Sequence, residues 1–374
     1  MDFALNEVQV MLADSVEKFI ANEYDFETRQ EHAGSKLGYS QETWQMIAGL
    51  GWTAVPFSED DGGLGGDPVD IMVLMERFGH GLLVEPYLAN IVLAGGILRR
   101  AASKAQKQQW LLPIVAADVQ ATLAFAEPQG RYDIADLTTT ARADGDDWVV
   151  SGTKSHVLNG GNADLLIIPA RTSGKQTDKG GISLFAIDAN SDGVSIRDYE
   201  TVDGQRAAEI LLRDVAVGGD RLIGEPGAGF DPLQETVADA TLAVCAEAIG
   251  IMQVLTDKTI EYSKNRSQFG VPIGSFQALQ HRMVEMYTAC EQSRSLLLWA
   301  VMTVADDVDS ASRAINSIKY QVGTAGKLIG EEAVQIHGGM GVTWELDIAH
   351  YFKRLTAIRQ IFGNADFHLD KLAV

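Results

Sequence analysis

The hydrophobic period of the chain changes twice along its length, and this limits the folds open to it. Apolar residues recur at helical spacing from Phe3 to about Pro113. Between Ala121 and about Val217 the pattern becomes short β-rich runs, and Asp144–Asp147 reads as a hairpin turn between two of them. After the glycine-rich segment 224–229 the helical period returns and persists. The sequence therefore predicts an α+β protein with the order α, β, α.

The same changes of period predict three domains. We expect an N-terminal helical domain over 1–120, a middle antiparallel β domain over 121–223, and a C-terminal four-helix bundle over 224–374. In the first domain, the glycine-rich stretch 60–68 is predicted to be a loop. The bundle helices are expected over Leu233–Asn265, Ser275–Asp306, Ser310–His337 and Glu345–Phe362.

Charge and composition exclude several classes of partner. The chain has 30 Lys and Arg against 51 Asp and Glu, a formal net charge of −21. Such a chain repels phosphate backbones, so we expect no nucleic-acid binding. No apolar run reaches the roughly 18 residues that a membrane span needs, and the segment 1–7 lacks the features of a signal peptide, so a cytoplasmic location is predicted. Cys245 and Cys290 lie within apolar helical patterns and are predicted to be buried core thiols.

Several common site motifs are missing from the sequence. The glycines of 62–66 are not followed by the Lys-Ser/Thr of a phosphate-binding loop, so a turn is the better interpretation. The seven histidines form no His-Glu-x-x-His and no cluster with cysteine, so we expect no metal site. A Gly-x-Ser-x-Gly elbow and a dinucleotide-binding fingerprint are also missing. The absence of these two motifs disfavours a hydrolase and a doubly wound nicotinamide dehydrogenase.

Three motifs in order carry a more specific signal. Asn265–Gly270 (NRSQFG) ends the first long C-terminal helix, Ile273–Gln280 (IGSFQALQ) opens the next, and Gln335–Gly341 (QIHGGMG) ends the third. With the α, β, α order, these segments resemble the acyl-CoA dehydrogenase family over essentially the whole chain. Phe125–Pro128 and Lys154–Gly161 are similar to segments of its middle domain. The pattern is closest to the small subunit of pimeloyl-CoA dehydrogenase and related partner subunits of heteromeric bacterial enzymes.

The resemblance implies a fold and a chemistry. Family members have the three domains predicted above and usually assemble as tetramers, so we expect no stable monomer. They desaturate an acyl-CoA thioester: a carboxylate removes the α-proton, FAD accepts the β-hydrogen as hydride, and an electron-transferring flavoprotein takes the electrons. The chemistry needs a base, hydrogen bonds to the thioester carbonyl, and a flavin against Cβ.

In this family one subunit holds the flavin ring and its neighbour holds the adenosine and pyrophosphate end of FAD. Arg266 matches the arginine that faces the pyrophosphate, where a guanidinium suits two phosphate oxygens. The resemblance implies this cofactor-binding set: Arg266, Phe269, Gln277, Gln335, Gly338 and Gly339. Taken without the family pattern, Arg266 reads as a helix C-cap and the two glycines read as a plain turn.

The flavin and substrate side departs from the family pattern. Gly363 stands at the usual position of the catalytic Glu, and Ala240 stands at the alternative position on the first bundle helix. The neighbouring Asp239 points about 100° away on a helix, and with Glu235 we interpret it as a solvated charge of the first turn. We therefore predict that this chain supplies no base, and that Gly363→Glu restores some proton abstraction. Three more positions differ from what the resemblance implies. His156 stands where the family has a Trp that packs on the flavin, and Leu158 stands where it has a Thr that bonds the flavin N5 edge. Tyr132 stands on the acyl-CoA path, where the family has a small residue.

The losses fall on one side of the cofactor, while the adenosine-side residues remain. This favours a subunit that completes the FAD site of a catalytic partner in a heterotetramer. Two alternatives stay open: a self-sufficient homo-oligomeric acyl-CoA dehydrogenase with a non-standard base, and a non-catalytic acyl-CoA-binding or scaffold protein. The substrate-binding residues and the acyl group are not identified. Resemblance to partner subunits points only to bulky or dicarboxylic acyl groups, as in fatty acid or steroid catabolism.

Overall fold

The computed structural model describes residues 5–306 and 308–373, and the chain forms two compact units. The first unit comprises Met1–Glu31, Pro68–Leu83 and Thr241–Val374, and the second comprises His32–Asp67 and Val84–Ala240. The N-terminal helices are thus shared between the two units. The domain boundaries at 120 and 223 stay a prediction.

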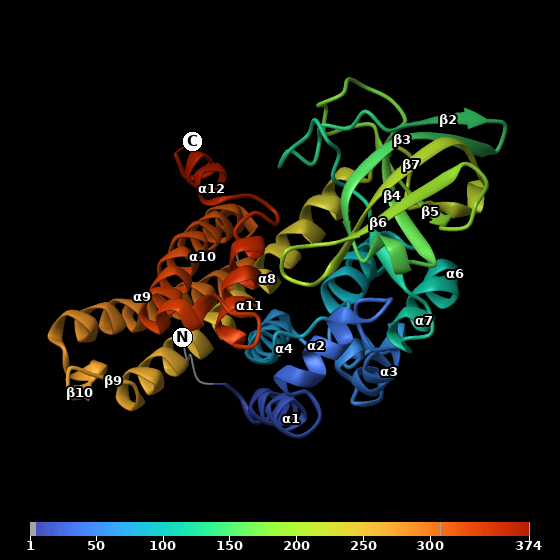
Figure 1. The fold of residues 1–374 in the computed structure, drawn as a ribbon. Coiled ribbons are helices and arrows are strands. Elements are labelled where there is room, and N and C mark those ends of the chain that lie inside the picture. Colours follow the sequence, from blue (N-terminus) through green and yellow to red (C-terminus); the bar gives the residue numbers. More distant parts are fainter. Residues whose placement is uncertain (1–4, 307, 374) are drawn as a thin grey trace. The chain divides into compact units, whose positions relative to one another are not determined.

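The first unit is helical. Asn6 caps its first helix by accepting from the Gln9 N–H, while Phe3, where helical spacing was expected to begin, lies outside the described residues. In Figure 1, α9 and α10 run side by side. The helices are α1 (Glu7–Glu23), α4 (Pro68–Gly81), α9 (Gln277–Asp306), α10 (Val308–His337), η8 (Gly338–Val342), α11 (Asp347–Ile358), α12 (Ala365–Leu372) and most of α8 (Phe230–Asn265).

Close packing in this unit depends on small residues between α4 and α8. A Cβ atom at Gly250 would lie 1.9 Å from the Glu76 carbonyl oxygen, and one at Gly79 would lie 2.2 Å from the Glu247 carbonyl oxygen. Only glycine permits backbones to approach so closely. A buried ion pair joins α8 to α11, where the Arg354 guanidinium donates to both carboxylate oxygens of Glu247 at 2.6 and 2.7 Å.

The fourth bundle helix is shorter than predicted. The apolar pattern extended it to Phe362, but α11 ends at Ile358. Phe362 and Gly363 then adopt φ values of 59° and 116°, which no α-helix contains. The Lys319 ammonium donates to the Ile358 and Gly363 carbonyls at 2.9 and 2.7 Å, so it satisfies the backbone where the helix stops.

The second unit begins with short helices and a tight loop. Its helical segments are α3 (Gln41–Gly49), η1 (Trp52–Ala54), η2 (Glu59–Asp61), η3 (Leu88–Gly95), α5 (Gly96–Ala101), α6 (Lys104–Gln106), η4 (Lys107–Leu111) and α7 (Leu112–Val115); α2 (Phe26–Gly34) lies at the division between the units. The predicted loop 60–68 contains the end of η2 and then irregular chain up to α4. Its backbone N–H groups donate to the preceding turn, from Gly65 to Phe57 and from Gly66 to Val55, at 2.7 and 2.8 Å.

A strongly twisted sheet forms the rest of this unit (Figure 1). The strand order is β6-β7-β3-β2-β4-β5-β8, and β1 also pairs with β4. The predicted hairpin is confirmed, since Asp144 pairs with Asp147 across the turn between β2 and β3. Most pairs are antiparallel, but β1 and β2 both pair with β4 in parallel. The strands are β1 (Ala121–Leu123), β2 (Thr140–Asp144), β3 (Asp147–Leu158), β4 (Leu165–Arg171), β5 (Ile182–Asp188), β6 (Val194–Glu200), β7 (Arg206–Val217) and β8 (Leu222–Ile223), with η5 (Gly160–Asn162) and η6 (Gly219–Arg221) between them.

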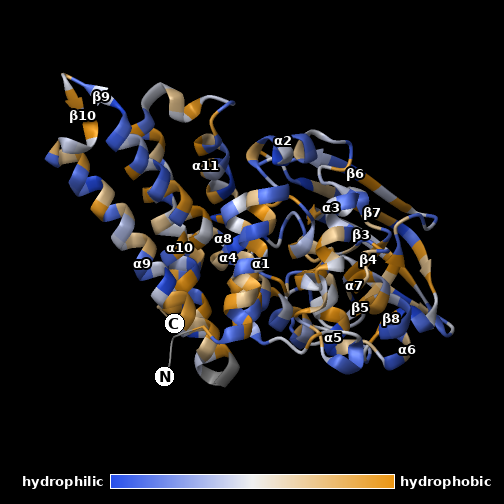
Figure 2. Ribbon diagram, turned by 90° about the horizontal axis from the view of Figure 1, so that it is seen from below, coloured by the Kyte–Doolittle hydropathy of each residue, from blue (hydrophilic) through white to orange (hydrophobic). Residues whose placement is uncertain are grey.

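The core of the sheet is apolar and its central strands are buried on both faces. Every residue of β4 is buried, as are the first six of β5. Figure 2 shows the matching hydrophobic colour along these strands. Phe185 is fully buried, and Trp148 packs edge-on against its ring with centroids 5.4 Å apart. Such continuous apolar runs are typical of strands covered on both faces.

The helix α8 corrects one sequence-based expectation. It contains an 18-residue window with mean hydropathy 1.5, which is long and apolar enough to span a membrane by composition. Within the structure, 72% of that window is buried, as in the core helix of a soluble protein. Cys245 of α8 and Cys290 of α9 are free, buried thiols, as predicted, and burial raises the pKa of each to about 12.

Candidate functional site

An exposed aromatic ring lies on the β-hairpin that joins α8 to α9. The hairpin pairs β9 (Ser267–Gln268) with β10 (Val271–Pro272), and its two turn residues, Phe269 and Gly270, have φ values of 55° and 82°. Two positive φ values in a row are typical of a tight type I′ hairpin turn. The Phe269 residue is 93% exposed, and its ring meets the Phe276 ring edge-on with centroids 6.2 Å apart. The turn therefore holds an apolar ring in solvent, where a partner surface or cofactor can cover it.

Arg266 lies directly before this hairpin, at the C-terminal end of α8. Its backbone is fixed, because its N–H donates to the Tyr262 carbonyl and its carbonyl accepts from Ile273, both at 2.8 Å. Its side chain is exposed. Among residues 5–306 and 308–373, the guanidinium forms no ion pair and donates to no carbonyl of α8. Its five N–H donors are therefore available to an external anion.

The C-terminal end of α10 lies next to the end of α8. The Tyr262 ring stacks on the His337 ring with centroids 4.3 Å apart, and the Tyr262 hydroxyl donates to the His337 carbonyl at 3.5 Å. Gly338 has a φ of 63° and is exposed together with Gly339, and a Cβ atom at either position would meet no atom within 4 Å. The structure thus places exposed, uncrowded glycine backbone beside the helix that carries Arg266.

The other two predicted cofactor-binding residues, Gln335 and Gln277, also lie at helix ends. Gln335 is exposed in the last turn of α10, and Gln277 is exposed as the first residue of α9. All six residues therefore lie in the first unit, at exposed positions at the ends of three helices and in the hairpin between α8 and α9. The set fits the pyrophosphate end of the FAD that the resemblance implies, since an unpaired guanidinium and uncrowded glycine backbone suit phosphate oxygens.

The positions matched to the flavin ring offer much less. His156 has a φ of 50° at a register shift between β3 and β7, and its Nδ1 lies 3.4 Å from the Tyr199 hydroxyl. Leu158 has no hydrogen-bonding side-chain group to offer the flavin. Tyr132 is half-buried, and burial raises its pKa. These side chains do not fit the flavin end of the cofactor.

Gly363, at the usual position of the base, has no room for a side chain. A Cβ atom there would lie 2.5 Å from Nε2 of His368 and 2.6 Å from Cδ1 of Phe367, both on α12. The φ of 116° also favours glycine. The expectation that Gly363→Glu restores proton abstraction therefore needs correction, because α12 fills the space that the new side chain would enter.

Buried side chains hold this turn in place. His368 is 4% exposed, with Nδ1 2.8 Å from the Asn316 amide oxygen and Nε2 3.1 Å from the Phe362 carbonyl oxygen. Burial, together with the positive charge of Lys319, lowers the pKa of His368 to about 4. The imidazole is therefore neutral near pH 7, and because both neighbours are acceptor oxygens, its single N–H donates to one of them. It serves to lock the turn and is poorly placed to act as a base.

The alternative base position is also closed. Ala240 is fully buried. Asp239, predicted to be a solvated charge, is instead engaged in an ion pair: its side chain is 23% exposed, and its Oδ2 accepts from Arg99 at 2.5 Å and from Arg100 at 2.6 Å. Glu235 accepts from Arg100 Nε at 2.9 Å. The prediction of a solvated charge is therefore wrong for Asp239, because two arginines at the end of α5 pair with it, whereas the Glu235 side chain is 63% exposed, as predicted.

Sequence reasoning missed a buried ion pair in the second unit. The side chains of Glu127 and Lys154 are both fully buried, and their charged atoms lie 2.7 Å apart. Lys154 shares the inward face of β3 with the fully buried Val150. A charge at an inward position of an alternating strand is the signal that should have revealed the pair.

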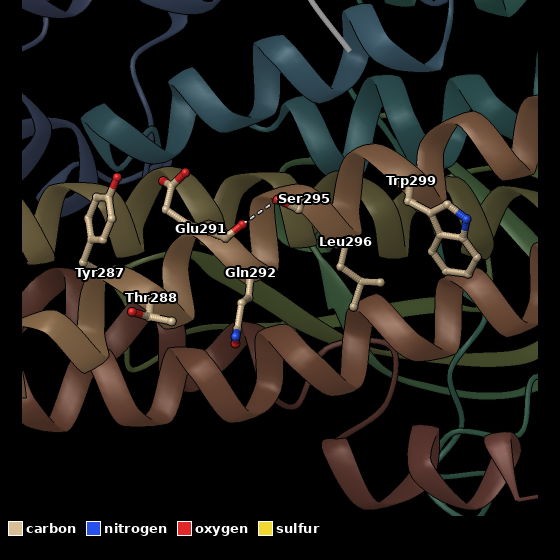
Figure 3. A pocket seen from close by; sticks show the side chains of 7 residues that line it. All are labelled: Tyr287, Thr288, Glu291, Gln292, Ser295, Leu296 and Trp299. Carbon is tan, nitrogen blue, oxygen red and sulfur yellow. Dashed lines mark hydrogen bonds between the residues drawn. The ribbon is translucent and has the colours of Figure 1, made fainter. Parts of the chain in front are cut away.

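A hollow on the outer face of α9 is a second surface feature of the first unit (Figure 3). It has a volume of about 560 Å³ and is lined by one face of the helix, including Tyr287, Leu296 and Trp299. Tyr287 and the nearby Val284 are 52% and 62% exposed. Figure 2 shows hydrophobic and hydrophilic residues alternating along this helix. Exposed large apolar side chains on a helix are common where another chain packs. Among the described residues, no group of three or more His, Cys, Asp or Glu is placed to hold a metal ion.

Comparisons with known proteins show which family this chain resembles. Models of the N-terminal, middle and C-terminal domains of acyl-CoA dehydrogenases match residues 6–118, 122–215 and 227–374. The mitochondrial short-chain specific acyl-CoA dehydrogenase of Bos taurus is 32% identical over 317 residues, covering 83% of this chain and 76% of that protein.

Two solved structures share the fold over the full length of this chain. The ChsE4-ChsE5 complex of Mycobacterium tuberculosis contains a chain with a TM-score of 0.91 and 26% identity, 98% of which is covered. The glutaryl-coenzyme A dehydrogenase in complex with glutaryl-CoA has a TM-score of 0.93 and 25% identity, with 96% of that chain covered. With three domain models in order and a relative above 30% identity, the chain belongs to the acyl-CoA dehydrogenase family of FAD-dependent oxidoreductases.

Proposed function

We propose that this chain is a subunit of a heteromeric, FAD-dependent acyl-CoA dehydrogenase and completes the FAD site of a catalytic partner subunit. One observation carries the proposal: the pyrophosphate-side residues are open, whereas the position of the base is filled. Arg266 has no partner among the described residues, while a Cβ atom at Gly363 would collide with His368 and Phe367. This chain therefore offers a residue for the pyrophosphate end of FAD but has no room for the base that removes the α-proton.

The residues of this chain would bind and orient the cofactor. Arg266 would donate a bidentate pair of hydrogen bonds to pyrophosphate oxygens, and the backbone at Gly338 and Gly339 would approach the same end. Phe269 would cover an apolar part of the bound cofactor or of the partner subunit. FAD, when bound, supplies the hydride acceptor of the α,β-desaturation. The partner subunit would supply the carboxylate that removes the α-proton, and an electron-transferring flavoprotein would take the electrons.

Association with another subunit is supported by the exposed apolar side chains of the first unit. Phe269, Val284 and Tyr287 are 93%, 62% and 52% exposed. The solved ChsE4-ChsE5 structure is a complex, and one of its chains shares this fold. Interfaces of obligate assemblies typically bury more than about 2,000 Å². We therefore expect an oligomer, such as a tetramer, and a monomeric mass by light scattering at micromolar concentration would count against the proposal.

The experiment is to capture the partner and count the flavin. The tagged chain is purified from its native host, the co-purifying subunit is identified, and FAD per complex is measured from the absorbance spectrum. Arg266→Ala should weaken FAD binding about thirtyfold, since a charge-assisted bidentate contact contributes about 2 kcal/mol. Lys264→Ala is the matched control, because Lys264 is an exposed cation two residues earlier.

The outcomes separate the alternatives. Reduced FAD affinity in Arg266→Ala with normal affinity in Lys264→Ala supports the proposal. Equal affinity in both variants refutes the role of Arg266. No FAD in the complex of the unmodified chain favours a scaffold or an acyl-CoA-binding protein.

A further inference from the structure

The second unit contains a polar hollow that the proposed function does not use. It has a volume of about 480 Å³ and lies between the loop 56–66 and the C-terminal end of α5. Pro56, Phe57 and Ser58 line it together with the charged side chains of Asp61, Arg99 and Arg100. This volume lies within the range of small-molecule sites, and its lining combines apolar surface with a few charged groups. None of the residues assigned above to the FAD site belongs to it.

Arg99 has unused hydrogen-bonding capacity in this hollow. One Nη atom donates to the Pro56 carbonyl at 3.0 Å, and the other donates to Asp239 at 2.5 Å. A guanidinium carries five N–H donors, so three of them make no bond within the described residues. The Arg99 side chain is 27% exposed although it lies in the wall of the hollow. Burial lowers its pKa, but a guanidinium remains charged near neutral pH.

The two arginines are held side by side. A single oxygen, Oδ2 of Asp239, accepts from both Arg99 and Arg100, at 2.5 and 2.6 Å. Arg100 is further fixed by Glu235 and by the Gly96 carbonyl. Because both side chains are already ordered, a ligand would bind them with little additional loss of side-chain entropy.

The charge balance at the hollow favours an anion. Asp239 compensates one of the two guanidinium charges, and Glu235 pairs with Arg100 at 2.9 Å, although its side chain is 63% exposed and solvent screens part of its charge. Asp61 is the one carboxylate in the lining, and Lys107 pairs with it at 2.9 Å. In a chain of net charge −21, this hollow is an unusual place where two cations converge.

We propose that this hollow binds a small organic carboxylate. Its carboxylate group would accept from the free N–H donors of Arg99, whose planar fork matches two carboxylate oxygens. Its carbon chain would lie over the small apolar part of the lining at Pro56 and Phe57, of which Phe57 is only 1% exposed. Phosphate is tetrahedral and brings no carbon chain to these apolar residues, so the site selects a carboxylate over inorganic phosphate.

The test is calorimetric titration of the full chain, in its native assembly and at constant ionic strength, with hexanoate and, separately, with inorganic phosphate. Hexanoate should bind and phosphate should bind more weakly. Arg99→Gln should weaken hexanoate binding at least tenfold, because it removes a charge-assisted contact. Asp61→Asn should strengthen it severalfold, because it removes the negative charge that faces the ligand.

Asp188→Asn is the control variant. Asp188 is a 57% exposed carboxylate of the same unit that pairs with Arg221, so its loss changes net charge equally and should leave hexanoate binding unchanged. If Arg99→Gln fails to fold, as judged by circular dichroism, the expected gain in hexanoate affinity of Asp61→Asn still tests the proposal. No binding, tighter binding of phosphate than of hexanoate, or equal binding by Asp61→Asn and the unmodified chain would overturn the proposal.

Discussion

The Glu127–Lys154 pair couples its two partners, because removal of one leaves the other charged and buried. The Lys154 ammonium donates to Glu127 at 2.7 Å and to the Pro169 carbonyl at 2.8 Å. Glu127 also accepts from the Thr138 N–H and hydroxyl, at 2.7 and 2.6 Å, and from the Thr139 N–H at 3.1 Å. The pair therefore connects β3 and β4 to the two ends of the segment 127–139.

The charges of the pair are strongly perturbed. Burial disfavours ionisation of Glu127, but the Lys154 ammonium and hydrogen bonds from Lys154, Thr138 and Thr139 together lower its pKa to about 2. Burial lowers the pKa of Lys154 to about 8, although Glu127 opposes this effect. Each charge depends on the other, because an isolated ion at 0% exposure has no solvent to stabilise it.

We expect Lys154→Met to destabilise the second unit by about 3–5 kcal/mol, since it leaves a buried carboxylate without its cation. Glu127→Gln should cost a similar amount. The double variant should be less destabilised than the sum of the two, with a coupling free energy of at least about 2 kcal/mol. Hydrogen exchange of peptides covering 127–139 reports the opening of this segment directly.

A matched control is Arg197→Met, in a surface pair with Glu209 whose side chains are 75% and 46% exposed, which should change exchange by no more than about 1 kcal/mol. If Lys154→Met leaves exchange of the segment 127–139 unchanged, or if the two single variants are strictly additive, the buried pair does not organise this loop and the reasoning fails.

Three further predictions concern the turn after α11. Gly363→Ala should destabilise the first unit by about 2–3 kcal/mol in chemical denaturation, since a Cβ atom would lie 2.5 Å from His368 at a φ of 116°. Gly363→Glu should gain no dehydrogenase activity. A stable, active Gly363→Glu chain would refute this account of the turn. Because the folded pKa of His368 is about 4 and its unfolded pKa about 6.5, its contribution is complete above pH 6.5 and is lost as the pH falls toward 4. The unmodified chain should therefore lose up to about 3 kcal/mol more over this range than His368→Gln, and parallel curves would contradict the assignment. Lys319→Met should lower stability by about 2 kcal/mol, because two buried carbonyls lose their donor, and an unchanged melting temperature would count against it.

The periodicity of the sequence predicted the element types well, because these elements have strong local signals. The hairpin at Asp144–Asp147 follows from turn chemistry, and the long bundle helices follow from apolar spacing. The end of α11 was misjudged by four residues because Phe362 continues the apolar pattern. The carbonyls at this turn are bonded by Lys319, which lies 39 residues away from Ile358 in the sequence, so local signals do not contain that contact.

The candidate site shows the same limit. Motif spacing located Arg266 and Phe269, and their exposure depends only on a local hairpin. In contrast, the arginine partners of Asp239 lie about 140 residues earlier in the chain. The residues that fill the space at Gly363 belong to a separate short helix. Such contacts depend on tertiary packing, which one sequence does not display.

The central claim is that this chain completes a cofactor site and supplies no base of its own. The most direct measurement is dehydrogenation of acyl-CoA substrates by the purified chain alone, with added FAD and an artificial electron acceptor. A positioned general base typically contributes 10²–10⁴-fold, so turnover should be negligible for the isolated chain and should appear when the partner subunit is added. Robust turnover by the isolated chain, abolished by Asp239→Asn and independent of any partner, would contradict the account and identify a complete enzyme.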